Sequence, residues 1–215
     1  MRRDERVVRE LVGAHGQTYA EEVGIRLRDT PQPLYRLLVL SHLLSARIRG
    51  SVAVAAARSL YGAGLRDPRR MASASWQDRV DALGRGGYRR YDERTATQLG
   101  EGAGLLGERW GGDLRRLRRE AGGEVSELRR LLREFPGIGP AGADIFLREA
   151  QRVWPEVAPY LDDKALQGAD RLGLPKDPER LTELAGDTEP AVLAAALVRV
   201  AVDKEVAEDS LRRAE

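Results

Sequence analysis

The fold of this chain is decided by residues 135–143, which read FPGIGPAGA. Apolar residues recur at helical spacing on both sides of this stretch, up to Phe135 and again from Ala143. Pro136 ends the first helix, the glycines can adopt backbone angles that other residues resist, and Pro140 suits the first turn of a second helix. The stretch therefore predicts a helix, a tight hairpin and a second helix.

The hairpin is a candidate phosphate site. We expect the backbone N–H groups of Gly137, Gly139 and the first turn of the second helix to point outward without partners. Such groups stand at the positive end of a helix dipole and bind a phosphate without a charged side chain. They would hold a DNA strand without reading its sequence, because phosphates carry no base identity. A turn that needs glycine only for its shape is the alternative.

A second informative stretch is residues 160–164, YLDDK, which precedes apolar residues at helical intervals as far as Gly173. Asp162 is placed to be the N-cap of that helix. The helix N–H groups and dipole would hold its carboxylate ionised, as a fixed negative charge. An ordinary helix cap is the alternative, since aspartate is among the commonest cap residues.

Together these stretches resemble the helix-hairpin-helix Gly/Pro-Asp signature of the DNA glycosylase superfamily that includes endonuclease III and adenine glycosylase. In that family Leu-Pro-Gly-Val-Gly is followed by a helix, then by Val-Asp-Thr-His. The resemblance covers approximately residues 34–174 and places the catalytic aspartate on Asp162, with Asp163 as second candidate. It implies that Gly137, Ile138, Gly139 and Ala141 bind DNA.

Residues 43–47, LLSAR, resemble the family segment Leu-Leu-Ser-Ala-Gln. The family glutamine enters the gap that an extruded base leaves in DNA. Arg47 stands at this position here, and its guanidinium can fill such a gap by stacking. The resemblance therefore implies that Arg47 contacts DNA.

The remaining pattern predicts an all-α protein, because apolar residues recur in threes and fours and do not alternate for long. Helices are expected at residues 6–12, 34–45, 52–61, 71–83, 91–99, 113–119, 179–184 and 190–202, with Ser75 as a cap and residues 102–112 as a connector. The resemblance implies two helical subdomains with a helix-hairpin-helix motif flanking a DNA-binding cleft. We expect the first at residues 28–150, and the second, carrying the aspartate, at residues 1–27 with 151–215.

The composition limits cofactors and location. The absence of cysteine excludes disulfides and thiolate metal sites, so the four-cysteine iron–sulfur cluster of many family members is not expected. His15 and His42 are too few and too far apart for a metal site, and His42 is expected to be a packed residue of a helix. The hairpin carbonyls could hold a monovalent cation, as in some family members. Without a secretory signal or an apolar run of about 20 residues, we expect a cytoplasmic, nucleoid-associated monomer with no membrane partner.

Charge is distributed unevenly, although 36 Lys and Arg against 34 Asp and Glu give a net charge of only +2. Arginines cluster at residues 85–94, 115–119 and 129–133, whereas residues 177–189 and 203–209 are acidic. One basic face is therefore expected. Solvated helix faces are the alternative interpretation.

The resemblance implies base removal from double-stranded DNA that contains a damaged or mismatched base. Family members that also cut the strand attack the sugar with a lysine at the position of Ala141, so we expect a glycosylase without lyase activity. Three alternatives stay open: a lyase using another amine such as Lys164, a non-catalytic DNA-binding protein of the same fold, and a helical interaction protein.

Overall fold

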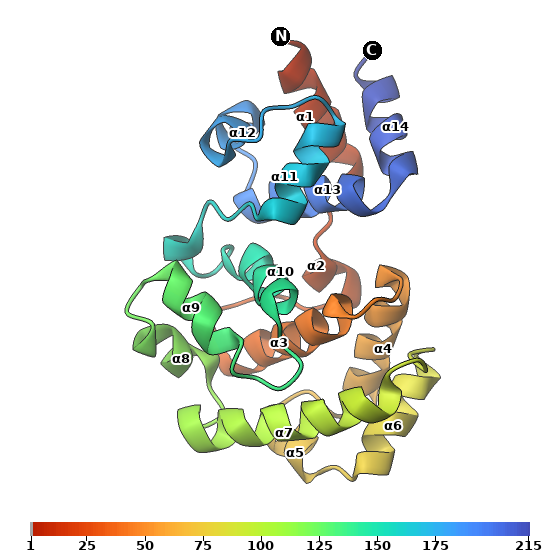
Figure 1. Cartoon of the computed structure of the whole chain (residues 1–215), viewed down its shortest axis with the longest axis vertical. Coiled ribbons are helices and arrows are strands. Elements are labelled where there is room, and N and C mark those ends of the chain that lie inside the picture. Colours follow the sequence, from red (N-terminus) through yellow and green to blue (C-terminus); the bar gives the residue numbers. More distant parts are fainter. Residues whose placement is uncertain (1) are drawn as a thin grey trace. The chain divides into compact units, whose positions relative to one another are not determined.

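The computed structural model describes residues 2–215, and every regular element in that range is helical (Figure 1). Residues 2–215 contain fourteen α-helices and one short 3-10 helix, so the all-α prediction is confirmed. The chain divides into two compact units. We call Ala20–Leu147 the central unit, and the residues up to Tyr19 together with Arg148–Glu215 the terminal unit. The sequence had suggested divisions a few residues later, after residues 27 and 150.

The central unit is formed by consecutive helices, and its last helix continues into the terminal unit after Leu147. The helices are α2 (Tyr19–Val23), α3 (Pro31–Ser45), α4 (Gly50–Gly62), α5 (Pro68–Ser73), α6 (Trp76–Arg85), α7 (Asp92–Trp110), α8 (Leu114–Glu120), α9 (Val125–Leu132) and α10 (Pro140–Ala150).

Helix α3 is the core helix of the central unit. It begins with proline in its first turn, a position where the missing N–H is harmless. Leu34, Leu37, Leu40 and Leu43 are fully buried, as the leucine pattern predicts. The helix packs against α4 and α8, and Figure 1 shows it between α10 and α7.

The expected connector at residues 102–112 was wrong, because α7 continues without a break to Trp110. Two of its glycines, Gly100 and Gly102, are explained by close packing. A Cβ on Gly100 would lie 2.7 Å from the Arg79 guanidinium, and one on Gly102 would touch Phe135. Arg79 is buried and donates to three backbone carbonyls, those of Met71, Ala74 and Ala96. Tertiary contacts therefore override the low helix propensity of glycine.

The terminal unit is built around α13 (Pro190–Val202), which is apolar along almost its whole length. Around it pack α1 (Arg3–His15), α11 (Asp163–Arg171), α12 (Pro178–Ala185) and α14 (Lys204–Arg213). The 3-10 helix η1 (Pro155–Val157) lies between α10 and α11 in sequence. The bounds of α13 match the prediction, whereas α14, capped by Asp203, had not been expected.

Ser75 caps α6 by accepting the Asp78 N–H, as predicted. Helix α6 is separate from α5, so the helix expected at residues 71–83 is interrupted before Ser75. Among residues 2–215, no helix combines the length and the apolar character that crossing a membrane would require.

Candidate functional site

The hairpin between α9 and α10 has exposed backbone donors. Gly137 has a φ of +83°, a conformation that favours glycine. Within residues 2–215, the N–H groups of Gly137, Gly139 and Ala141 have no hydrogen-bond partner. Gly137 and Ala141 are exposed and Gly139 is partly exposed. The start of α10 therefore presents free donors at the positive end of its dipole.

Ile138 is buried, unlike the three hairpin residues with free donors. Its side chain is 4% exposed, and its N–H donates to the Phe135 carbonyl at 3.0 Å. A Cβ on Gly142 would lie 3.3 Å from the Ile138 side chain and 3.5 Å from Ser45. Ile138 therefore anchors the hairpin, while Gly137, Gly139 and Ala141 supply the donors.

A polar pair of buried His42 and half-buried Gln98 lies beneath Gly137. His42 on α3 donates from Nε2 to Gln98 Oε1 on α7 at 3.1 Å, which assigns the proton of the neutral ring to Nε2. A Cβ on Gly137 would lie 2.4 Å from His42 Nε2 and 2.6 Å from Gln98 Oε1. Burial lowers the pKa of His42 to about 4, against the opposing effect of the Gln98 hydrogen bond. His42 is therefore a neutral support for the hairpin at pH 7.

The cavity beside this pair is small. It lies among α3, α7 and the hairpin, with Tyr35, His42, Gln98 and Ile138 in its wall. Its volume is about 20 Å³, the space of a single water molecule. It is too small to receive a nucleobase.

Arg47 follows α3 at the place where that helix packs on α10. Ser45 is the contact residue for Gly142, and Arg47 comes two residues later. The Arg47 side chain is exposed and has no hydrogen bond or ion pair within residues 2–215. Its guanidinium is available to a ligand of the hairpin.

The three arginine clusters differ in their pairing. In the second and third clusters, ion pairs neutralise several members: Arg115 with Asp113, Arg118 with Asp29, Arg129 with Asp144, and Arg130 with Glu127. In the first cluster, the guanidinium groups of Arg85, Arg89, Arg90 and Arg94 make no ion pair or hydrogen bond within residues 2–215, and all four are exposed. We call these four the loop arginines, because Arg89 and Arg90 lie in the loop between α6 and α7 while Arg85 ends α6 and Arg94 lies in the first turn of α7.

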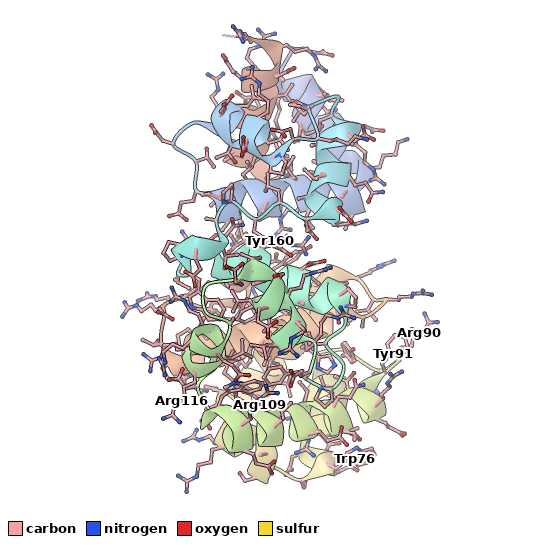
Figure 2. The ribbon with its side chains drawn as sticks, turned by 60° about the vertical axis from the view of Figure 1, so that its left-hand side comes forward. Trp76, Arg90, Tyr91, Arg109, Arg116 and Tyr160 are labelled. Carbon is pink, nitrogen blue, oxygen red and sulfur yellow. The ribbon has the colours of Figure 1, made fainter. Side chains whose placement is uncertain are left out.

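Of the loop arginines, Arg94 is near enough to the hairpin to act on the residue beneath it. The charge of Arg94 contributes to the lowered pKa of His42, which lies directly beneath Gly137. Figure 2 shows Arg90 beside Tyr91, with its guanidinium 5.3 Å from the ring centre. The first cluster is therefore a set of exposed cations without ion pairs, whereas ion pairs hold several arginines of the other two clusters.

Asp162 caps α11 in the terminal unit, as predicted. Its Oδ1 accepts the N–H of Ala165 at 3.2 Å and a hydrogen bond from Arg148 Nη1 at 3.3 Å. The side chains of Asp162 and Arg148 are each 10% exposed. No residue within 2–215 donates to Asp162 Oδ2. One carboxylate oxygen is thus held by two donors, and the other is unbonded.

The neighbouring candidates are less suited to chemistry. Asp163 is exposed and its side chain has no hydrogen-bond partner within residues 2–215. Lys164 is also exposed, and its Nζ donates to Gln167 Oε1 at 2.8 Å. Ala141 offers only a methyl group. Of the two aspartates, only Asp162 is therefore held in a defined orientation by donors from other residues.

Sequence reasoning missed the residues that support both sites, namely Gln98 in the central unit and Arg148 with Gln151 in the terminal unit. Arg148 continues the apolar series of α10, and it is 8% exposed. A charged residue in such a series indicates a buried partner. The sequence does not reveal that the partner is Asp162, because no local rule joins residues 14 positions apart.

Metal ligands do not gather in the described part of the chain. Within residues 2–215, no group of three or more His, Cys, Asp or Glu side chains is placed to hold a metal ion. The chain has no cysteine, so its residues do not fit the four-cysteine iron–sulfur cluster of many members of the family that the sequence resembles.

Comparison with known proteins identifies the fold. No protein-family model and no curated protein matches the chain. Similar solved structures include two that each have 15% sequence identity to this chain, with 91% of this chain and 84% of the other covered. They are a non-covalent endonuclease III–DNA complex, with a TM-score of 0.51, and a trapped endonuclease III–DNA covalent intermediate with an estranged adenine, with a TM-score of 0.49. The likeness to the non-covalent complex shows an endonuclease III-like fold.

Proposed function

We propose that this chain is a DNA glycosylase that hydrolyses the N-glycosidic bond of a damaged or mismatched base in double-stranded DNA and leaves the strand intact. The observation that carries the proposal is the Asp162 carboxylate, held on Oδ1 by Ala165 and Arg148 while Oδ2 stays unbonded. The likeness to a solved endonuclease III–DNA complex supports DNA as the partner.

Binding would use the central unit. The free N–H groups of Gly137, Gly139 and Ala141 suit a phosphate oxygen, as helix N-termini commonly do. The loop arginines and Arg47 add cations that can replace counterions along the backbone. These contacts would hold a DNA duplex whatever its base sequence.

The chemistry would use the terminal unit. After the nucleotide has been extruded, the C1′–N bond breaks and its electron pair leaves with the base. The sugar then carries positive charge, which the Asp162 carboxylate stabilises. Water adds its oxygen to C1′, its proton passes to the carboxylate or to solvent, and the base takes up a proton. These steps require an ionised carboxylate with one accessible oxygen.

Strand cleavage is not part of the proposal, because it needs an amine that attacks C1′. Ala141 has none, and the exposed Lys164 is hydrogen-bonded to Gln167. Borohydride reduction of enzyme with a damaged duplex should therefore trap no covalent complex. A trapped complex that disappears in Lys164→Ala would show lyase activity instead.

The central test compares two aspartates on duplexes that each carry one modified or mismatched base. We expect Asp162→Asn to slow single-turnover base excision by at least about 100-fold, because the charge opposite the sugar cation is lost. DNA affinity should stay near that of the wild type. Asp163→Asn, the matched control, should keep both excision and binding. Equal losses in the two variants would contradict the assignment.

A non-catalytic DNA-binding protein is the second candidate function, and one observation favours it. The ion pair with Arg148 partly neutralises Asp162 before any substrate arrives. This candidate predicts tight, salt-dependent DNA binding and no excision by the wild type on any duplex of the panel. Absent or salt-insensitive binding would instead indicate a protein without a nucleic-acid role.

A further inference from the structure

The loop that leads to Asp162 is held by a buried glutamine of the terminal unit. Gln151 follows the last residue of α10 and is 4% exposed. Its Oε1 accepts the Tyr160 N–H at 2.7 Å, and its Nε2 donates to the Tyr160 carbonyl at 3.1 Å and to the Arg148 carbonyl at 2.8 Å. Figure 2 shows Tyr160 on this loop. The amide therefore fixes the backbone two residues before Asp162.

The side chain of Asp162 is fixed from two further directions. The Ala165 N–H approaches Oδ1 from α11, and Arg148 Nη1 approaches the same oxygen from α10. A carboxylate with one donor can turn about its terminal bond and exchange its oxygens. Two donors on one oxygen oppose that exchange, so Oδ1 remains turned inward and Oδ2 remains the unbonded oxygen.

Stability alone does not account for this arrangement. Burying an arginine removes it from water, which is unfavourable, and a buried ion pair is often no more stabilising than apolar residues of similar volume. Arg148 nevertheless lies in a buried series of α10 and meets the carboxylate with little exposure of either partner. Its geometric effect is to determine which oxygen of Asp162 is free.

We infer that Arg148 and Gln151 are positioning residues that aim Asp162 Oδ2 at the sugar cation, Arg148 by holding Oδ1 and Gln151 by holding the loop. The inference rests on the proposed glycosylase function. In it, Arg148 affects the rate through the direction of the carboxylate, and it does not itself contact the reacting atoms.

The test uses Arg148→Met and Arg148→Lys in the full chain, with Arg152→Met as the matched control. Arg152 is four residues further along, exposed, and paired with Glu189 at 2.8 Å. In Arg148→Met we expect single-turnover excision to fall by about 10- to 100-fold, because a small misplacement of a reacting group has an effect of this size. Arg148→Lys, which keeps the charge, should recover part of the rate, and Arg152→Met should match the wild type.

A binding measurement separates positioning from mere folding. Wild-type protein should bind a duplex with a cationic pyrrolidine abasic mimic more tightly than one with the uncharged tetrahydrofuran mimic, because Asp162 faces the cation. Arg148→Met should lose most of this preference while its affinity for the tetrahydrofuran duplex changes less than about 2-fold, and Arg148→Lys should retain part of it. If Arg148→Met fails to fold, the same comparison is made with Arg148→Lys and with Gln151→Met, which releases the backbone of Tyr160.

The outcomes distinguish the two proposals. An unchanged rate and preference in Arg148→Met, with both lost in Asp162→Asn, would overturn the positioning role and keep the glycosylase. An increased preference would also overturn it, since Arg148 would then only screen the carboxylate. A wild type without excision and without preference would instead overturn the glycosylase proposal.

Discussion

At the scale of single residues, the support of the hairpin is a neutral histidine. His42 is 7% exposed, and burial lowers its pKa to about 4, with the charge of Arg94 acting in the same direction. In the unfolded chain a histidine titrates near pH 6.5. Between these values the unfolded state binds more protons than the folded state. Stability should therefore be complete above about pH 6.5 and decline as the pH falls toward 4.

This decline can be measured by urea unfolding of the wild type and of His42→Gln at several pH values. The difference between the pKa values corresponds to a loss on the order of 3 kcal/mol across the window. In His42→Gln, which cannot take up a proton but can still bond Gln98, this part of the acid dependence should disappear. Parallel curves for the two proteins would show that His42 titrates normally in the folded state.

Substitutions at two glycines of the hairpin distinguish an effect on stability from an effect on DNA binding. In Gly137→Ala the methyl group meets His42 and the residue keeps a positive φ, so we expect a loss of about 1–3 kcal/mol in the free energy of unfolding. In Gly139→Ala the methyl group meets nothing within 4 Å, so stability should change by less than about 0.5 kcal/mol.

DNA affinity should nevertheless fall in Gly139→Ala, because the methyl group occupies space beside the free donors. Gly107→Ala is the control, since Gly107 is an exposed residue of α7 with open space around it. Fluorescence anisotropy with a labelled duplex measures the difference. Equal affinities in Gly139→Ala and Gly107→Ala would indicate that no phosphate approaches the hairpin backbone.

At the scale of helices, α11, which Asp162 caps, lies very close to α13. A Cβ on Gly168 would be 1.9 Å from the carbonyl oxygen of Leu197, a backbone atom that cannot turn aside. Only glycine permits this approach of the two helix backbones. The position of Asp162 at the start of α11 therefore depends on a contact in the middle of that helix.

Gly168→Ala should separate α11 from α13 and reduce the free energy of unfolding by about 1–3 kcal/mol or more, the range for overpacking. Gln167→Ala is the matched control, because Gln167 is the exposed neighbour and its side chain accepts a hydrogen bond from the exposed Lys164. Urea unfolding measures both variants. A Gly168→Ala protein as stable as Gln167→Ala would show that the two helices can move apart freely.

At the scale of the whole molecule, net charge is a poor guide to DNA binding, because a value of +2 hides the difference between paired and free arginines. The loop arginines are free, whereas much of the positive charge in the other clusters is neutralised by Asp and Glu. The loop arginines are thus available to phosphates as a group.

The double variant Arg89→Ala/Arg90→Ala should weaken DNA binding and reduce the slope of log affinity against log salt by about 1–2, for two lost phosphate contacts. Arg116→Ala/Arg119→Ala removes the same charge from two exposed arginines of α8 and is the control; Figure 2 shows Arg116 projecting from the surface. Titrations at several salt concentrations test this. Equal slopes in the two double variants would indicate an effect of net charge alone.

The sequence alone determined the features that depend on near neighbours in the chain. The hairpin at residues 135–143 follows from two prolines and two glycines, and the caps at Ser75 and Asp162 follow from side chains that bond N–H groups three residues later. Such hydrogen bonds close within one helical turn. They are therefore visible in the order of residues.

Only the tertiary structure decided which distant groups meet. Arg148 and Asp162 are 14 residues apart, His42 and Gly137 are still farther apart, and the continuity of α7 depends on Arg79 and Phe135 packing against its glycines. The same holds for which arginines are paired. These contacts are set by how helices pack, and packing depends on the shapes of all the side chains at once, so no short stretch of sequence contains it.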